Sequence, residues 1–262
     1  MYAGFTARAL GCAIVLGLAA SPVGAAVVPF SFNLTTGNNN NVQDGNARFF
    51  SANSQWGKFN VRATGWSLET LANGSTFVRQ SKLMVYNGAT AGLGVISGDD
   101  QNGGSNQHTI DNGKRKDFVL LQFDRQIKLT GATFNTYNVL NAANKDSDAI
   151  VAWGTTPTNN WNQSLGLHNK GFNALATMFS GSLESNTTAT GNSTRSFNQA
   201  GASGDLWLIG AAFNNSDGRI DGFKLSAISA IPEPATWAMM IGGFGLVGAA
   251  ARRRTQGQAL SA

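Results

Sequence analysis

The feature that most constrains the fold is the absence of helical periodicity between residues 27 and 230. No window of about 11 or more residues there repeats apolar side chains at the spacing of a helix. Instead, short apolar or alternating runs are separated by Gly-, Asn-, Ser- and Thr-rich segments, and Asn73-Gly74 is a typical hairpin turn. The predicted strands cover residues 27–34, 49–50, 56–68, 77–86, 93–96, 118–123, 127–137, 149–153, 172–179, 206–213 and 220–228. We therefore predict an all-β body, a single β-sandwich domain with a jelly-roll-like topology.

Three details of this strand pattern are specific enough to check. The continuous apolar run 118–123 predicts a central strand, and Asp124-Arg125 predicts a tight turn after it. Residues 172–179 favour a strand over a helix, and the polar stretch 180–204 has few apolar residues to place in a sheet. The runs 206–213 and 220–228 are expected to pair with each other across an Asp-Gly turn and to close the domain.

Charge and cysteine content exclude several classes of protein. The chain has 19 basic and 14 acidic residues, of which four basic and one acidic lie in the terminal segments. The body therefore has 15 basic and 13 acidic residues, a net charge of about +2. Its one basic run, Lys114-Arg115-Lys116, is followed at once by an aspartate, so we expect no nucleic-acid partner. Cys12 is the only cysteine and lies in the N-terminal apolar segment, which excludes disulfides and thiol catalysis in the body.

The N-terminus has the three parts of a secretory signal peptide. Arg8 and the terminal amine precede an apolar stretch from Ala9 to Ala20, and small residues follow a Ser-Pro break. We predict that residues 1–26 direct the chain to the secretion translocon, with cleavage by signal peptidase after Ala25 or Ala26.

The C-terminus has an equally ordered arrangement. A Pro-Glu-Pro triplet, whose prolines favour extended backbone, precedes an uncharged apolar run and a block of three arginines. The run predicts a transmembrane helix over 235–251, at the short end of the range that spans a bilayer. The arginines predict that residues 255–262 form a cytoplasmic tail. By topology alone, the same segment also fits an ordinary single-span anchor. The residues of the pattern are Pro232, Glu233, Pro234, Trp237, Ala238, Arg252, Arg253 and Arg254.

This segment, 231–254, resembles the PEP-CTERM sorting signal in its PEPxxWA variant. The resemblance implies recognition by an exosortase, a membrane-embedded cysteine transpeptidase of certain Gram-negative bacteria. The enzyme would cut near the triplet and release the body or re-attach it at the cell surface. In that reaction the chain is the substrate, so these residues form a recognition site and are not catalytic.

Acidic and amide side chains gather in two loops of the body and suggest a structural calcium site. Ca²⁺ takes six to eight oxygen ligands in flexible loops, although the spacing here is not that of an EF-hand. Asp146 and Asp148 could join from a neighbouring loop. The competing interpretation is a set of turns in which these side chains cap their own backbone. The candidate ligands are Asp99, Asp100, Asp111, Asn112 and Asp117.

Other candidate chemistry is sparse. His108 and His168 are the only histidines, and no spacing of zinc ligands accompanies them. Most tryptophans lie in predicted strands and are expected in the core, whereas Trp161 stands among asparagines and is the candidate for an exposed carbohydrate contact.

The sequence thus predicts an exported, non-catalytic protein of the cell surface or extracellular matrix. It would be anchored transiently in the inner membrane, processed by an exosortase, and associated with exopolysaccharide and biofilm. The alternatives are a surface-tethered carbohydrate-binding module, which would bind polysaccharide directly, and a secreted hydrolase. No cofactor other than the candidate calcium ion is expected.

Overall fold

The computed structural model describes residues 28–36, 47–88, 91–100, 106–158, 160–186, 191–197 and 200–233, together with Gly243 and Gly245, whose backbone is helical. The predicted signal peptide, the rest of the predicted transmembrane helix and the C-terminal tail lie outside these residues. The elements are β1 (Phe30–Asn33), β2 (Ala47–Ser54), β3 (Gly57–Thr70), β4 (Thr76–Gln80), β5 (Lys82–Tyr86), β6 (Gly92–Ile96), β7 (Ile110–Asp111), β8 (Lys116–Thr136), β9 (Ala149–Gly154), α1 (Phe172–Ala176), β10 (Phe179–Ser185), β11 (Ser193–Ser196), β12 (Gly204–Ala211) and β13 (Gly222–Pro232). The prediction of an all-β body is confirmed.

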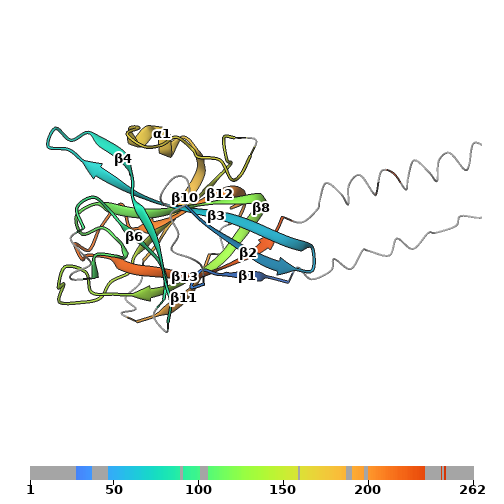
Figure 1. The fold of residues 1–262 in the computed structure, drawn as a ribbon, viewed down its shortest axis with the longest axis horizontal. Helices are drawn as coiled ribbons and strands as arrows, with labels where there is room; N and C mark the ends of the chain where they lie inside the picture. Colours follow the sequence, from blue (N-terminus) through green and yellow to red (C-terminus); the bar gives the residue numbers. More distant parts are fainter. Residues whose placement is uncertain are drawn as a thin grey trace, which may run out of the picture.

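The predicted jelly-roll-like β-sandwich is corrected: the strands of the described residues form one 13-stranded sheet and not two separate sheets. Its main path runs β10-β9-β12-β8-β13-β6-β5, and β3 leaves it from β8 to carry the hairpin partners β2 and β4. All strand pairs are antiparallel. Figure 1 shows how the strands are arranged in space, with α1 outside the sheet. The Asn73-Gly74 turn joins β3 to β4 as predicted, with Gly74 at a φ of 82° that glycine adopts without steric cost.

The strand β8 organises the sheet because its two halves have different neighbours. Residues 116–123 lie between β3 and β12, which confirms the central position predicted for 118–123. Residues 127–136 lie between β13 and β11. The predicted turn at Asp124-Arg125 was wrong: the strand continues through it, and Asp124 instead accepts a hydrogen bond from Asn60 Nδ2 at 2.7 Å. Neighbours on both sides of each half keep the backbone extended.

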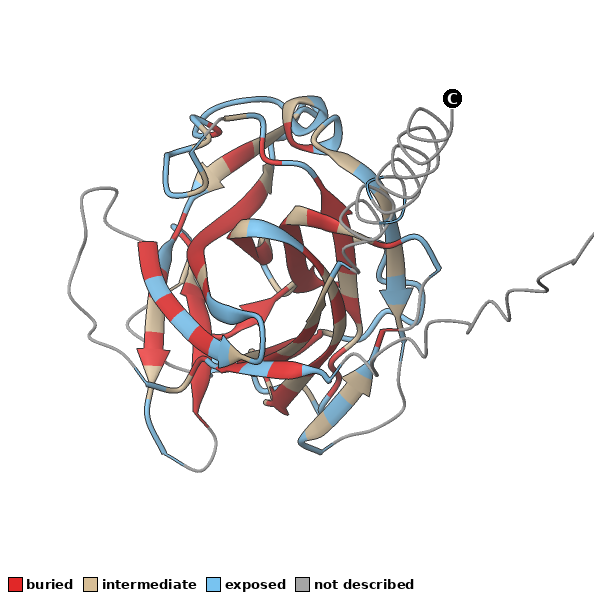
Figure 2. Ribbon diagram, turned by 90° about the vertical axis from the view of Figure 1, so that its right-hand side faces the viewer, coloured by how far each residue is buried: buried red, intermediate tan, exposed pale blue. Residues whose placement is uncertain are grey.

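Side chains on the two faces of the sheet enter two cores. The larger core contains Val119, Leu121 and Phe123 of β8 and is lined by strands on all sides, as the buried residues in the end view show (Figure 2). Phe118 and Leu120, on the other face of the same strand, enter a second core beneath the segment 165–179. Because both faces are buried, this stretch of β8 is apolar on both faces, and its one polar residue, Gln122, is buried and accepts a hydrogen bond from Arg62.

Two further predictions are corrected. Residues 172–176 form the short helix α1 and not a strand, because Leu175 packs into the second core while the neighbouring polar groups face solvent. The runs 206–213 and 220–228 do not pair with each other. β12 pairs with β8 and β9, whereas β13 pairs with the other half of β8 and with β1, β6 and β7. The polar stretch 180–204 contributes the rest of β10 and β11, whose side chains alternate between exposed and half-buried.

Candidate functional site

The Pro-Glu-Pro triplet begins inside the sheet. Pro232 is the last residue of β13 and lies opposite Ile127 of β8. Proline has no N–H to donate, so it is tolerated at the end of a strand. The next residue, Glu233, accepts a hydrogen bond from Ser203 Oγ through its Oε1. No motif had pointed to Ser203, a single serine in a Gly-Ala-Ser-Gly loop. Pro234, Trp237, Ala238 and the three arginines lie outside the described residues, as do Ala25 and Ala26.

The predicted calcium ligands divide into residues with different partners. Asp99 is bound by Arg115, whose Nε lies 2.6 Å from Asp99 Oδ2. Asp100 Oδ2 accepts the backbone N–H of Ser97 at 2.6 Å, a turn-capping contact. Asn112 points away from both and donates to Asp221 Oδ2 at 2.6 Å.

Asp111 and Asp117 are the buried members of the predicted set. Burial, reinforced by the charge of Asp100, raises the pKa of Asp111 to about 7, although Gly113 N–H and the Thr109 hydroxyl hydrogen-bond to its carboxylate. Asp117 is 1% exposed, and its Oδ1 has no hydrogen-bond partner among the residues that the structure describes. Burial raises its pKa well above the ordinary value, Asp111 and Asp100 add to the rise, and Arg115 opposes it. A cation near these carboxylates would relieve their repulsion.

A second acidic cluster forms around the start of β13. One carboxylate oxygen from each of Asp146, Asp148 and Asp221 lies within 4.8 Å of the other two. Burial and then Asp148 raise the pKa of Asp221 to about 7, and burial also raises the pKa of Asp146. Asp146 and Asp148 were expected from the sequence, but Asp221 was missed, because its only signal was its place just before a strand.

Protein cations already face this second cluster. Arg219 Nη1 lies 3.8 Å from Asp146 Oδ2, and Arg195 donates from Nη2 to Ser147 Oγ at 2.5 Å. Burial lowers the pKa of Arg195, and the three aspartates oppose that effect. The cluster offers hard oxygen ligands for Ca²⁺, but the guanidinium groups supply part of the same neutralisation.

The two histidines line different clefts. His108 Nδ1 lies 2.9 Å from the Tyr86 hydroxyl, in a small cleft that Lys224 also lines. Burial lowers the pKa of His108, with Asp100 acting in the opposite direction. His168 is on the loop that crosses β3, and its Nδ1 accepts the backbone N–H of Gln80 at 3.2 Å.

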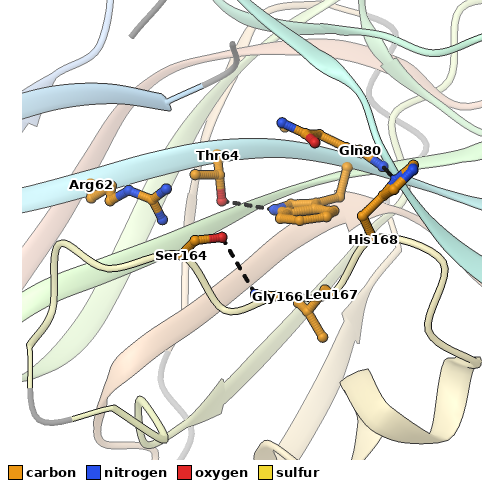
Figure 3. A pocket seen from close by; sticks show the side chains of 9 residues that line it. Arg62, Thr64, Gln80, Ser164, Gly166, Leu167 and His168 are labelled. Carbon is orange, nitrogen blue, oxygen red and sulfur yellow. Dashed lines mark hydrogen bonds between the residues drawn. The ribbon is translucent and has the colours of Figure 1, made fainter. Parts of the chain in front are cut away.

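A polar cleft lies between β3 and this loop (Figure 3). It encloses about 360 Å³ of space not filled by protein atoms, part of it open to solvent. Trp66 forms one wall, 6% exposed, and its indole N–H donates to Thr64 Oγ1 at 2.8 Å. The described residues that line the cleft include no carboxylate: Arg62, Thr64, Gly65, Trp66, Gln80, Ser164, Gly166, Leu167 and His168.

Trp161 lies on the same loop and partly confirms the exposure expected of it. It is half-buried, and its ring meets Phe49 edge to face at a centroid distance of 6.1 Å. Phe49 is 49% exposed and lies opposite Arg62 in the β2–β3 register. Among the strand tryptophans, Trp66, Trp153 and Trp207 are buried as expected, whereas Trp56 is 41% exposed at the β2–β3 turn.

Comparison with known proteins decides the nature of the C-terminal segment. The protein-family model for the PEP-CTERM protein-sorting motif matches residues 230–254. The chain carries a PEP-CTERM sorting motif. Searches of curated proteins and of solved structures gave no match for the chain.

The PEP-CTERM motif implies export and anchoring by the C-terminal segment before exosortase processing. Within the part of the chain that the structure describes, no helix has the length and apolar character needed to cross a bilayer. The PEP-CTERM match begins at Ala230, inside β13, so the motif and the last strand share residues. The described body therefore continues into its sorting motif without a linker.

Proposed function

We infer that the chain is a non-catalytic surface or matrix protein that an exosortase processes at Pro232-Glu233-Pro234 and that resides in exopolysaccharide or biofilm. The observation that carries this proposal is the PEP-CTERM match at residues 230–254. The all-β body supports it, because a sheet with two apolar cores can present its loops on a stable scaffold at the cell surface.

The tripeptide contacts add a requirement to the processing step. Pro232 lies in register with β8, and Glu233 is bound by Ser203. A protease or transpeptidase needs an extended, accessible segment, so the end of β13 must separate from β8 before cleavage. Separation at a strand end costs few contacts, which is consistent with local opening of terminal segments.

The test is the intact mass of the mature protein from its native host, with Glu233→Ala as the comparison. A wild-type C-terminus near Pro232, with the tail retained in the variant, supports processing. Retention of residues 237–262 in both proteins would reduce the segment to an ordinary anchor and overturn the proposal. Ser203→Ala is the matched control, because it removes the partner of Glu233 but leaves the motif intact.

A second function, a surface-tethered carbohydrate-binding module, is favoured by the pair Phe49 and Trp161. Aromatic rings that remain partly exposed beside polar loops offer the flat apolar faces on which sugar rings stack. Trp161 is on the same loop as Ser164 and His168, and Phe49 is on β2 opposite Arg62, which lines the polar cleft. Binding of oligosaccharides to the full-length protein, and its loss in Trp161→Ala, tests this function separately from processing.

A further inference from the structure

The polar cleft presents hydrogen-bond donors from several directions. The Thr64 hydroxyl accepts the indole N–H of Trp66, which leaves its own proton to donate. Ser164 Oγ accepts the backbone N–H of Gly166 at 3.4 Å and likewise keeps its proton. Because His168 Nδ1 accepts from Gln80, the proton of the neutral ring lies on Nε2. Three side chains on two segments can therefore donate to one ligand.

The cleft also carries a positive charge, which favours the same kind of ligand as its hydrogen-bond donors. Arg62 contributes a permanently charged guanidinium and is 3% exposed. Its Nη1 donates to two neutral oxygens, Gln122 Oε1 at 2.7 Å and the Gln163 carbonyl at 3.2 Å, which fix the side chain against β8 and the loop. Figure 3 shows the guanidinium ending beside Thr64 and Ser164. Donors around a cation, with no carboxylate among the described lining residues, suit a small oxyanion.

Apolar surface next to the donors indicates what carries the oxyanion. Trp66 and Leu167 line the cleft itself, and the Phe49–Trp161 pair lies just beyond Arg62 and Gln163. A free phosphate or sulfate would not use these apolar faces. A sugar ring has apolar C–H faces as well as polar edges, and a uronic acid adds a carboxylate to the ring.

We propose that this cleft binds a hexuronate unit of an acidic polysaccharide, with the carboxylate at Arg62, Thr64 and Ser164, a ring hydroxyl at His168 and a neighbouring sugar on Trp161. The proposal rests on the surface location proposed above, and it names the ligand class of the body. Binding through aromatic contacts alone would leave the hydrogen-bond donors around Arg62 unused. Binding of a bare anion would leave the Phe49–Trp161 pair unused.

The experiment is calorimetric titration of the full-length protein in detergent with an oligogalacturonate and, as a matched ligand, its methyl ester. We expect binding of the acid and at least about tenfold weaker binding of the ester, because hydrogen bonds to a charged carboxylate are stronger than those to a neutral ester oxygen. Equal affinity for the two oligomers would overturn the proposal. Inorganic phosphate is the third ligand, and binding of phosphate without the oligomer would show an anion site only and overturn it as well.

The matched variants are His168→Asn and His108→Asn. Asn at 168 can still accept from Gln80 N–H but lacks the Nε2–H donor to the ring hydroxyl, so we expect it to weaken oligomer binding about three- to tenfold. The variant at 108 changes the other cleft and should leave the affinity unchanged. Equal effects of the two variants would contradict the assignment. Normal processing of the tail without hexuronate binding would refute this inference alone and leave the proposed sorting function intact.

Discussion

Replacing Asp111 with asparagine is expected to stabilise the protein at pH 8 and to change its stability little at pH 4. Asp111 is 4% exposed, and burial together with the charge of Asp100 raises its pKa from 3.8 to about 7. Between these values the unfolded chain loses the proton and the folded chain keeps it. The folded state therefore loses stability as pH rises from about 4 to 7.

The magnitude follows from the shift in pKa. A rise from 3.8 to about 7 corresponds to roughly 4 kcal/mol of lost stability once the pH exceeds both values. This is an upper figure, because Asp100 and Asp117 share the repulsion. Asparagine fits the local hydrogen bonds: its Oδ1 can accept from Gly113 N–H, and its amide can donate to Thr109 Oγ1, whose proton goes to the Asn106 carbonyl at 2.7 Å.

The assay is urea unfolding of wild type and Asp111→Asn at pH 4 and pH 8 in the presence of a chelator. Asp99→Asn is the matched control: its exposed ion pair with Arg115 should contribute no more than about 1 kcal/mol, with the opposite sign. The argument from burial would be refuted by two results together. The wild type would have the same free energy of unfolding at pH 4 and pH 8, and Asp111→Asn would be less stable than the wild type at both.

Added calcium turns the same variants into a test of the metal site. If Ca²⁺ binds the ionised carboxylates of Asp111 and Asp117, it should stabilise the wild type at pH 8 and stabilise Asp111→Asn much less. No change in the wild-type unfolding midpoint on titration with calcium would remove the calcium hypothesis. The stabilising effect of the variant in chelator would stand independently.

Three further results are expected. Phe123→Ala should lower the free energy of unfolding by about 3–5 kcal/mol because the ring is fully buried in the larger core, whereas Phe49→Ala should cost under about 1 kcal/mol, as urea unfolding would show. Gly65→Ala should cost about 1–3 kcal/mol and lower the melting temperature, since its Cβ would meet the Ser81 carbonyl oxygen at 3.0 Å and Leu83 Cβ at 3.1 Å. Ser203→Ala should speed conversion to the mature mass in a pulse-chase experiment without lowering the melting temperature, and slower conversion would contradict the contact's restraining role.

The sequence predicted strand positions better than strand partners. Alternation and turn residues located most strands, and the apolar run 118–123 correctly indicated burial on both faces. Partners are set by tertiary packing: nothing local in Asp124-Arg125 distinguishes a turn from a strand that continues between new neighbours. The segment 172–176 went wrong for the same reason, since a single buried leucine determines its conformation.

The candidate sites divide in a similar way. The sorting triplet was found from the sequence because its order along the chain is its signal. The acidic residues were found by type, but their grouping was not: Asn112 and Asp221 are far apart in the chain and hydrogen-bond in the fold. Arg62 was missed altogether, because a strand arginine acquires a binding role only when the loop 160–168 crosses it.

The position of β13 makes the fold a check on the completeness of synthesis. It is the last strand, it fills the place between one half of β8 and strands β1, β6 and β7, and it overlaps the first residues of the sorting motif. A chain exported from its N-terminus cannot fill that place until the motif itself arrives. Prematurely terminated chains would leave four strands with unpaired edges, open to proteases and aggregation. A chain that stops before the first residues of its sorting motif cannot complete its sheet, so these truncated products are the ones that quality control can recognise.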